Sequence, residues 1–243
     1  MAVLIGLIIF AYYITIVAIT NRTSLSACQL YASQARFAPA MYIHGQWWRL
    51  ITGLFLHQNP WHFVVNFYGA LYTVGVMELY WGHFWVLVVF LASGMLCGAT
   101  SSIVNPYMVG CGTSGPIIML LSAHMFIVVF VPDEHHVGLS PIKIRIFRWV
   151  SDALGILTIA IVDIVGTQGT DIVFHWTNAA FGVLAGILLA HKIEMPDHIL
   201  LYLTYMQMVC STCLIVWIVI VLATLMYSTK SDQFLDIDPC NMT

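Results

Sequence analysis

Charged residues are scarce in this sequence. Of its 243 residues only 8 are Lys or Arg and 11 are Asp or Glu, while 60% are hydrophobic. A soluble globular domain is about 25% charged, so the composition excludes a water-soluble fold, and the apolar content excludes disorder. Basic clusters are also missing and the net charge is only -3, which excludes nucleic acid as a partner. The composition is that of an integral membrane protein.

Long apolar runs separate the few polar stretches. A membrane-spanning helix needs about 20 mostly apolar residues, and we therefore expect an all-α, polytopic helical membrane protein in which residues 1–243 form a single domain. The first run could instead be a signal peptide, but it lacks a basic start and a cleavage site of small residues. The seven expected spans are 1–20, 59–80, 84–104, 113–131, 149–166, 173–191 and 199–227.

Basic residues indicate the orientation of these spans. The connection 132–148 holds the densest group of Lys and Arg, which is typical of a cytosolic loop, although the count over all loops is tied. We expect the N-terminus inside, with the C-terminus and a partly membrane-embedded loop at 21–58 outside. Asn21 and Asn241 begin glycosylation sequons on the expected outer side. The two sequons, together with the lack of a basic amphipathic presequence, favour the secretory pathway or plasma membrane over a mitochondrion.

The six cysteines form no metal-binding pattern, and we expect neither a metal nor another cofactor. Cys28 and Cys240 are both expected outside and could pair, but nothing in the sequence establishes the pairing. The 10 histidines outnumber the 8 Lys and Arg residues. Polar residues of this kind in a membrane indicate chemistry.

Three expected spans that enter from the outer face carry polar residues near their beginnings. His62 and Asn66 are four residues apart and so lie about 6 Å apart along one helix face. Ser114 opens a second span, and His175 lies within about two turns of the start of a third. Parallel helices place these groups at similar depth. The spacing therefore predicts a functional site in this layer.

The layer has the groups that acyl transfer needs. Ser114 becomes a nucleophile when a base takes its proton, and His175 could be that base. The Ser114 backbone N–H and the side chains of His62 and Asn66 could stabilise an oxyanion. Glycines would permit close backbone approach around the nucleophile and between helices; they are Gly112, Gly115, Gly182 and Gly186.

Over roughly residues 45–190 the sequence resembles the rhomboid family of intramembrane serine proteases. A seventh span after a six-span core is similar to the eukaryotic secretase-type arrangement. The motifs that carry the resemblance are Gly45-Gln-Trp-Trp48-Arg49-Leu-Ile-Thr52, Phe55-Leu-His57-x4-His62-x3-Asn66, Glu78, Gly112-Thr-Ser114-Gly115 and His175-x6-Gly182-x3-Gly186.

The resemblance implies a dyad of Ser114 and His175 with no carboxylate, and an oxyanion hole of His62, Asn66 and the Ser114 N–H. It implies substrates that are single-pass transmembrane proteins, cleaved within the lipid bilayer near its outer face. None of the charged residues is then expected in the catalytic layer. Structural roles are implied for Trp48, Arg49, Glu78, Gly112, Gly115 and Gly182.

Two departures from the family pattern leave an alternative open. Asn178 stands where the family has a small glycine, and Ile118 stands where many relatives have an aromatic ring. The chain could therefore be a proteolytically silent relative that binds or escorts membrane clients. A membrane di-iron oxidase is a third hypothesis, because His57-x4-His62 matches one histidine box, but the further boxes that two metal sites need are missing.

The remaining polar residues have simpler explanations. Asp171 could orient His175 as in a triad, but an acid favoured at a helix N-terminus is the preferred interpretation. Asp152 and Asp163 are expected to reach the membrane interfaces. Loops or span ends are expected for the other histidines, which are His44, His57, His83, His124, His135, His136, His191 and His198.

Overall fold

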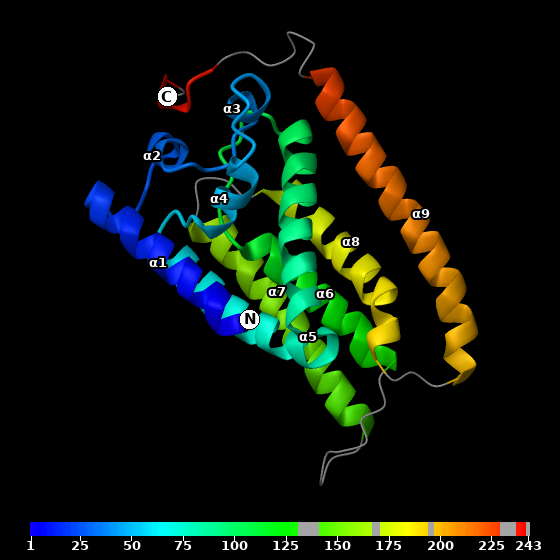
Figure 1. Ribbon diagram of the computed structural model, residues 1–243. Coiled ribbons are helices and arrows are strands. Elements are labelled where there is room, and N and C mark those ends of the chain that lie inside the picture. Colours follow the sequence, from blue (N-terminus) through cyan, green and yellow to red (C-terminus); the bar gives the residue numbers. More distant parts are fainter. Residues whose placement is uncertain (131–140, 167–170, 194–196, 229–236, 242–243) are drawn as a thin grey trace.

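The computed structural model is helical (Figure 1) and describes residues 1–130, 141–166, 171–193, 197–228 and 237–241. Within these ranges there is no β-strand, and the only β-bridge is an isolated one between Arg36 and Gly110. The expected all-α class is confirmed. The elements are α1 (Ala2–Thr20), α2 (Ala27–Ala32), α3 (Ala38–Tyr42), α4 (Arg49–Phe55), α5 (Pro60–Val104), α6 (Ser114–Phe130), α7 (Pro141–Gly166), α8 (Ile172–Leu188), the 3-10 turn η1 (Ala190–Lys192), α9 (Asp197–Ser228) and the 3-10 turn η2 (Pro239–Asn241).

Long helices overlap every range expected to span the membrane. Two of these ranges lie in α5, which is broken at Gly82, where φ is 75° and ψ is 166°. α7 begins at Pro141 rather than at residue 149, because proline suits the first position of a helix, so part of the expected basic connection is helical. Residues 131–140 of that connection lie outside the described residues. In the described chain, three segments are long and apolar enough to cross a membrane: Ala2–Thr20, Pro60–Val104 and Tyr202–Tyr227.

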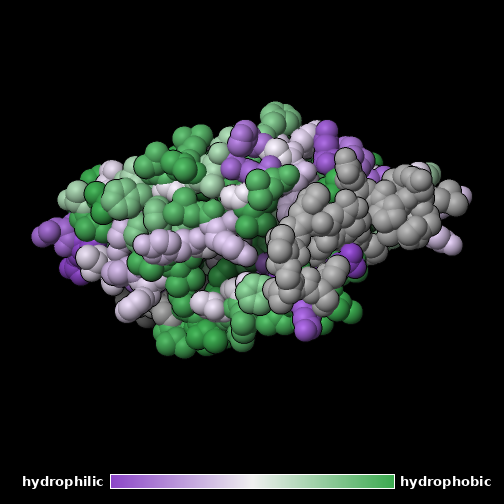
Figure 2. All heavy atoms as spheres, turned by 90° about the horizontal axis from the view of Figure 1, so that it is seen from below, coloured by the Kyte–Doolittle hydropathy of each residue, from purple (hydrophilic) through white to green (hydrophobic). Residues whose placement is uncertain are grey.

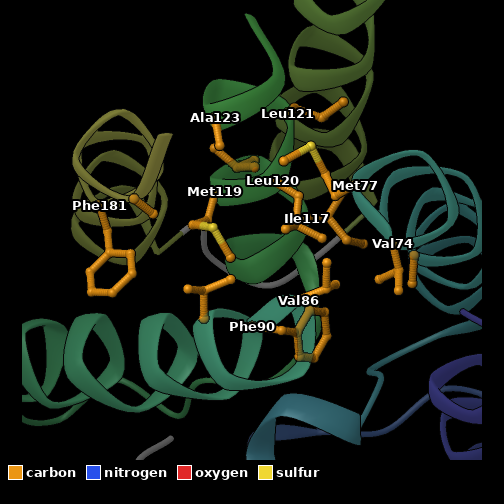
Figure 3. Close-up of a cluster of buried hydrophobic side chains, with 14 of the residues drawn as sticks. Val74, Met77, Val86, Phe90, Ile117, Met119, Leu120, Leu121, Ala123 and Phe181 are labelled. Atoms are coloured by element: carbon orange, nitrogen blue, oxygen red, sulfur yellow. The ribbon is translucent and has the colours of Figure 1, made fainter. Parts of the chain in front are cut away.

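The central helix of the fold is α6. Its residues Ile117, Met119, Leu120 and Ala123 are all 0% exposed. Figure 3 shows side chains of α6 pointing toward Val74, Met77, Val86 and Phe90 of α5 on one side and Phe181 of α8 on the other. A helix that is apolar all round belongs in the interior, and α6 accordingly carries its N-terminal residue, Ser114, into the middle of the bundle.

α6 and α8 pack against each other at backbone distance. A Cβ atom on Gly182 would lie 2.2 Å from the carbonyl oxygen of Met119, and one on Gly186 would lie 3.3 Å from that of Ala123. In lipid no hydrophobic effect drives helices together. Helices associate there through close van der Waals packing, which small residues permit. Any side chain at Gly182 would force the two helices apart.

The outer surface is apolar over large areas. Figure 2 shows hydrophobic residues across much of the face in view, with hydrophilic residues in smaller groups. On α9, Tyr202 is 71% exposed and Val209 is 62% exposed. Contiguous apolar surface of this extent is unfavourable in water and is solvated by lipid tails. The chain is an integral, multi-pass membrane protein.

A buried polar pair joins α6 to α7. His124 Nδ1 lies 2.7 Å from Asp152 Oδ2, and the two residues are 5% and 0% exposed. His124 lies inside α6 rather than at a loop or span end, so that expectation was wrong, whereas the interface position expected for Asp152 stays a prediction. Because α7 packs on α6, Asp152 faces another helix, and a carboxylate at that depth needs a hydrogen-bond partner. His44, His83 and His191 are exposed as expected, whereas His135, His136 and the side chains of Asp163 and His198 lie outside the described residues.

Replacing one member of this pair leaves the other buried and unpaired. We expect Asp152→Leu or His124→Leu to lower the free energy of unfolding by about 3–5 kcal/mol, and the double replacement to cost less than the sum of the two. Unfolding of the purified protein in mixed micelles measures this, with the exposed Asp238→Asn as a control. Single losses that simply add in the double variant would show that the pair is not coupled.

A disulfide joins Cys28 of α2 to Cys240 of η2, 212 residues apart in sequence. Figure 1 shows the segment 237–241, which contains η2, beside α2. The pairing that the sequence left open is thus present in the structure. Its presence also shows that both segments lie at the same end of the bundle.

Breaking this disulfide frees the C-terminal segment. We expect Cys28→Ser, or reduction, to destabilise the protein by about 2–4 kcal/mol, because the cross-link closes a long loop. Thiol counting by mass spectrometry after alkylation should find two more reactive cysteines after reduction, and thermal unfolding measures the stability. Cys213→Ser, which removes an exposed free thiol, is the matched control. It should change neither the melting temperature nor the number of cysteines that become reactive on reduction.

Candidate active site

A cavity of about 220 Å³ lies where the first turns of α6 and α8 meet the segments between α2 and α5. Ser114, His175 and His62 line it, as do Arg36 and Asp171, and Pro239 of the C-terminal segment forms part of its wall. Residues far apart in the sequence therefore share one site. The cavity contains most of the polar side chains that the sequence placed in one layer.

Ser114 and His175 are in hydrogen-bond contact. Ser114 Oγ lies 2.9 Å from His175 Nε2, and Ser114 is only 2% exposed. Ser114 is the first residue of α6, so its backbone N–H has no partner within the helix. His175 lies in the first turn of α8, held by its N–H bond of 3.1 Å to Asp171 O. The arrangement supplies a hydroxyl, a base and an available N–H at one point.

Gly112 brings the loop before Ser114 close to His62. Its φ is +108°, a left-handed conformation that favours glycine, and a Cβ atom there would lie 2.6 Å from His62 Nε2. The Gly112 N–H donates to Gly53 O at 2.9 Å, which ties the loop to α4. The His62 imidazole therefore lies directly beside the nucleophile loop.

Asn66 lies one helical turn from His62 and is 1% exposed. Its Nδ2 donates to the backbone oxygen of His62 at 2.8 Å, and Asn66 is not among the residues that line the cavity. The structure thus brings His62, Ser114 and His175 to the cavity, and Asn66 does not line it. That Asn66 contributes to an oxyanion hole stays a prediction.

His57 supports this region from outside the spans, although it was expected to be incidental. It is 1% exposed, its ring centroid lies 5.1 Å from that of His62, and its Nδ1 lies 3.1 Å from Phe55 O. Burial, followed by the neighbouring His62, lowers the pKa of His57 well below its usual value. A neutral His57 donates from Nδ1 and leaves Nε2 as an acceptor, 3.3 Å from Thr113 Oγ1.

The residues expected to be structural make local contacts. Arg49 donates from Nη1 to Tyr31 O at 2.7 Å and to Ala35 O at 2.9 Å, which fixes the loop around it. Trp48, 53% exposed, donates from Nε1 to Gln34 Oε1 at 2.8 Å. Glu78 accepts from the backbone N–H of Ala2 at 3.1 Å and so connects α1 to α5.

Three charged residues line the cavity, although none was expected in the layer: Arg36, Arg49 and Asp171. Arg36 and Asp171 line the same cavity as Ser114 and His175, and they form a buried ion pair. Asp171 is the N-cap of α8, accepting from the Phe174 N–H at 2.9 Å, as the preferred interpretation predicted. No sequence signal marked Arg36, because it stands alone in a connection and its partner is 135 residues away.

The two positions that depart from the family pattern are both buried. Asn178 is 0% exposed, and its Nδ2 donates to Phe174 O at 2.8 Å. A Cβ atom on Gly115 would lie 2.5 Å from that same Nδ2, so Asn178 occupies the space that Gly115 leaves open. Ile118, 3% exposed, packs in the central core. Neither residue separates Ser114 from His175.

Among the described residues, there is no group of three or more His, Cys, Asp or Glu side chains that could hold a metal ion. His57 and His62 are neighbours, but the histidine doublet at His135 and His136 lies outside the described ranges. A two-metal site would require several such ligands around each ion. The described residues that line the cavity fit an acyl-transfer site instead.

The described helices form an apolar bundle in which Ser114 and His175, near the starts of α6 and α8, are in hydrogen-bond contact. In a comparison with protein families, residues 44–193 match the Rhomboid domain, which is more than half of the chain. The chain belongs to the rhomboid family.

Curated relatives agree with this membership. Rhomboid-like protease 5 of Toxoplasma gondii is 28% identical over 148 residues, 60% of this chain and 16% of that protein. Rhomboid protease AarA of Providencia stuartii is 27% identical over 177 residues, 63% of this chain and 60% of that protein. Rhomboid protease GluP of Bacillus subtilis is 33% identical over 89 residues, 36% of this chain and 17% of that protein. The chain thus covers less than two thirds of each relative's length.

A side chain at Gly112 should disrupt the site. We expect Gly112→Ala to push the His62 ring away and to lower the labelling rate of Ser114 by a serine-directed fluorophosphonate about 100-fold, the effect of a misplacement of about 1 Å. Gly45→Ala is the matched control, because Gly45 also has a positive φ, +66°, but nothing lies within 4 Å of its Cβ position. Equal losses in the two variants would attribute the effect to backbone strain alone.

Proposed function

We propose that this chain is an intramembrane serine protease in which Ser114 is the nucleophile and His175 the general base. The 2.9 Å contact between Ser114 Oγ and His175 Nε2 carries the proposal, because a hydroxyl needs a base within hydrogen-bond reach to attack a carbonyl. Membership of the rhomboid family and relatives named as rhomboid proteases support it. No carboxylate is required as a third member.

The reaction follows from these positions. Ser114 Oγ forms a bond to the scissile carbonyl carbon as its proton moves to His175 Nε2. The oxyanion that results lies near the Ser114 N–H and the His62 ring, which would stabilise it, and Asn66, one helical turn from His62, is a further candidate donor. His175 then gives its proton to the leaving amine as the peptide bond breaks. A water molecule, deprotonated by His175, then forms a bond to the acyl carbon, and Ser114 Oγ leaves as it takes the proton back from His175 Nε2.

The substrates proposed are single-pass transmembrane proteins. α6 and α8 are each 17 residues long, about 25 Å at 1.5 Å per residue, which is shorter than the hydrocarbon core of about 30 Å. At least one end of each helix would therefore be recessed into the bilayer, and we infer that this is the N-terminal end, with Ser114 and His175. A substrate reaches them only from the membrane, and its helix must unwind locally before a carbonyl is accessible to attack.

The secretory pathway or plasma membrane is the proposed location. Disulfides persist in oxidising compartments, and the one between Cys28 and Cys240 lies at the same end of the molecule as the cavity, with Pro239 in the cavity wall. Asn21 and Asn241, which begin the two sequons, belong to the same end. Cleavage would then occur near the outer face, and products would be released outward.

Removal of either dyad member should abolish cleavage. We expect Ser114→Ala and His175→Ala to reduce the cleavage of a transmembrane peptide by at least about 1,000-fold, because the members of a dyad act as a unit. Purified protein in proteoliposomes, assayed against a panel of transmembrane peptides, measures this. Cys111→Ala, which removes a thiol three residues before Ser114, is the control and should retain activity. Full cleavage by Ser114→Ala would refute the proposal.

A relative that binds membrane clients without cleaving them would behave differently. Fluorophosphonate labelling should attach to Ser114 in the unmodified protein and should be lost in His175→Ala, because only a base-activated serine reacts. A silent relative would bind peptides but would show no labelling in any variant. Restoring the family's residue with Asn178→Gly would then test whether Asn178 is the cause.

A further inference from the structure

Arg36 stands at the junction of the two halves of the candidate site. Its backbone pairs with that of Gly110 in both directions, N–H to O at 2.9 Å and O to N–H at 2.8 Å. Gly110 lies four residues before Ser114, on the segment that leads into α6. The backbone of Arg36 therefore anchors the loop that carries the nucleophile.

The side chain of Arg36 reaches the helix that carries the base. Its guanidinium forms an ion pair with Asp171, the N-cap of α8, and its Cζ lies 4.8 Å from the centre of the Phe174 ring. Asp171 in turn holds the first turn of α8 through the Phe174 N–H at 2.9 Å. His175 is the next residue along that turn.

The surroundings are shaped to hold this pair. Arg36 is 7% exposed and Asp171 is 9% exposed, and Ser101 Oγ of α5 lies 2.7 Å from both carboxylate oxygens of Asp171. A Cβ atom on Gly110 would lie 2.3 Å from Arg36 Nη2, and one on Gly98 would lie 3.1 Å from Nη1. Two glycines thus leave the space that the guanidinium fills.

We propose that Arg36 and Asp171 are positioning residues that set the separation of Ser114 and His175. One arginine is bound through its backbone to the nucleophile loop and through its side chain to the N-cap of the base helix, so a shift of either part is resisted by the other. This inference rests on the proposed dyad. It assigns the pair no contact with substrate.

The experiment compares Arg36→Met, Asp171→Asn, the double variant and Arg36→Lys in proteoliposomes. Asn is as good an N-cap as Asp, so Asp171→Asn removes the charge and keeps the cap. We expect each single variant to lower kcat for a transmembrane peptide by about 10- to 100-fold, as misplaced catalytic groups do, with KM changed less than about 3-fold. The fluorophosphonate labelling rate should fall in parallel. Arg36→Lys keeps the charge but loses the planar fork and should recover part of the activity.

The double variant tests the coupling. Since it leaves no unpaired buried charge, it should be no slower than the slower single variant. Leu25→Ala is the control for loosening of the loop, because Leu25 is 5% exposed but does not line the cavity. Leu25→Ala should lower the melting temperature. Its fluorophosphonate labelling rate, measured 20 °C below its own melting temperature, should be unchanged.

Two outcomes overturn the positioning role while leaving the dyad intact. One is unchanged kcat and labelling in Arg36→Met and Asp171→Asn. The other is a loss of kcat and labelling in these variants that is equal to the loss in Leu25→Ala when their melting temperatures are equally lowered. That result would mean that reduced stability alone causes the loss. If the unmodified protein is never labelled at Ser114, the proposed function itself fails, and this result is distinguishable from both.

Discussion

The backbone contact between α6 and α8 is the constraint on which the site depends. Ser114 and His175 are on different helices, 61 residues apart, and their side chains meet at 2.9 Å. This is feasible only because Gly182 lets α8 approach within contact of the Met119 carbonyl of α6. In lipid no hydrophobic effect compensates for a poor fit between helices, so the size of the residues at the crossing limits how closely α6 and α8, and with them Ser114 and His175, can approach.

Polar cross-links fix the parts that this contact does not reach. Arg36 and Asp171 join a connecting segment to α8, His124 and Asp152 join α7 to α6, and a disulfide joins the C-terminal segment to α2. Both side-chain pairs are buried, where a polar or charged group without its partner would be costly. The charged residues of these two pairs therefore hold elements in position relative to one another.

Several features were accessible to sequence reasoning because their signal is local. Apolar runs of about 20 residues mark spanning helices, and glycines at Gly112 and Gly182 mark close approach. Arg36 and His124 were missed because each pairs with a residue of another element, 135 and 28 positions away. Their own neighbours in sequence look like those of an ordinary loop or span residue. The sequence predicted that α7 starts at residue 149 rather than at Pro141. Its first turns contain basic residues, so they form an amphipathic helix that is not recognised as an apolar run.

The sequence by itself determined that the chain lies in a membrane, that it is helical, and which serine and histidine stand near helix starts, because composition and spacing depend on residues close together in the chain. Only the tertiary structure decided that Cys28 and Cys240 are paired, that Asp171 caps α8 while binding Arg36, and that His62 lines the cavity while Asn66 does not. These facts depend on how helices rotate and cross. That rotation is set by the packing of many side chains together, and no single stretch of sequence contains it.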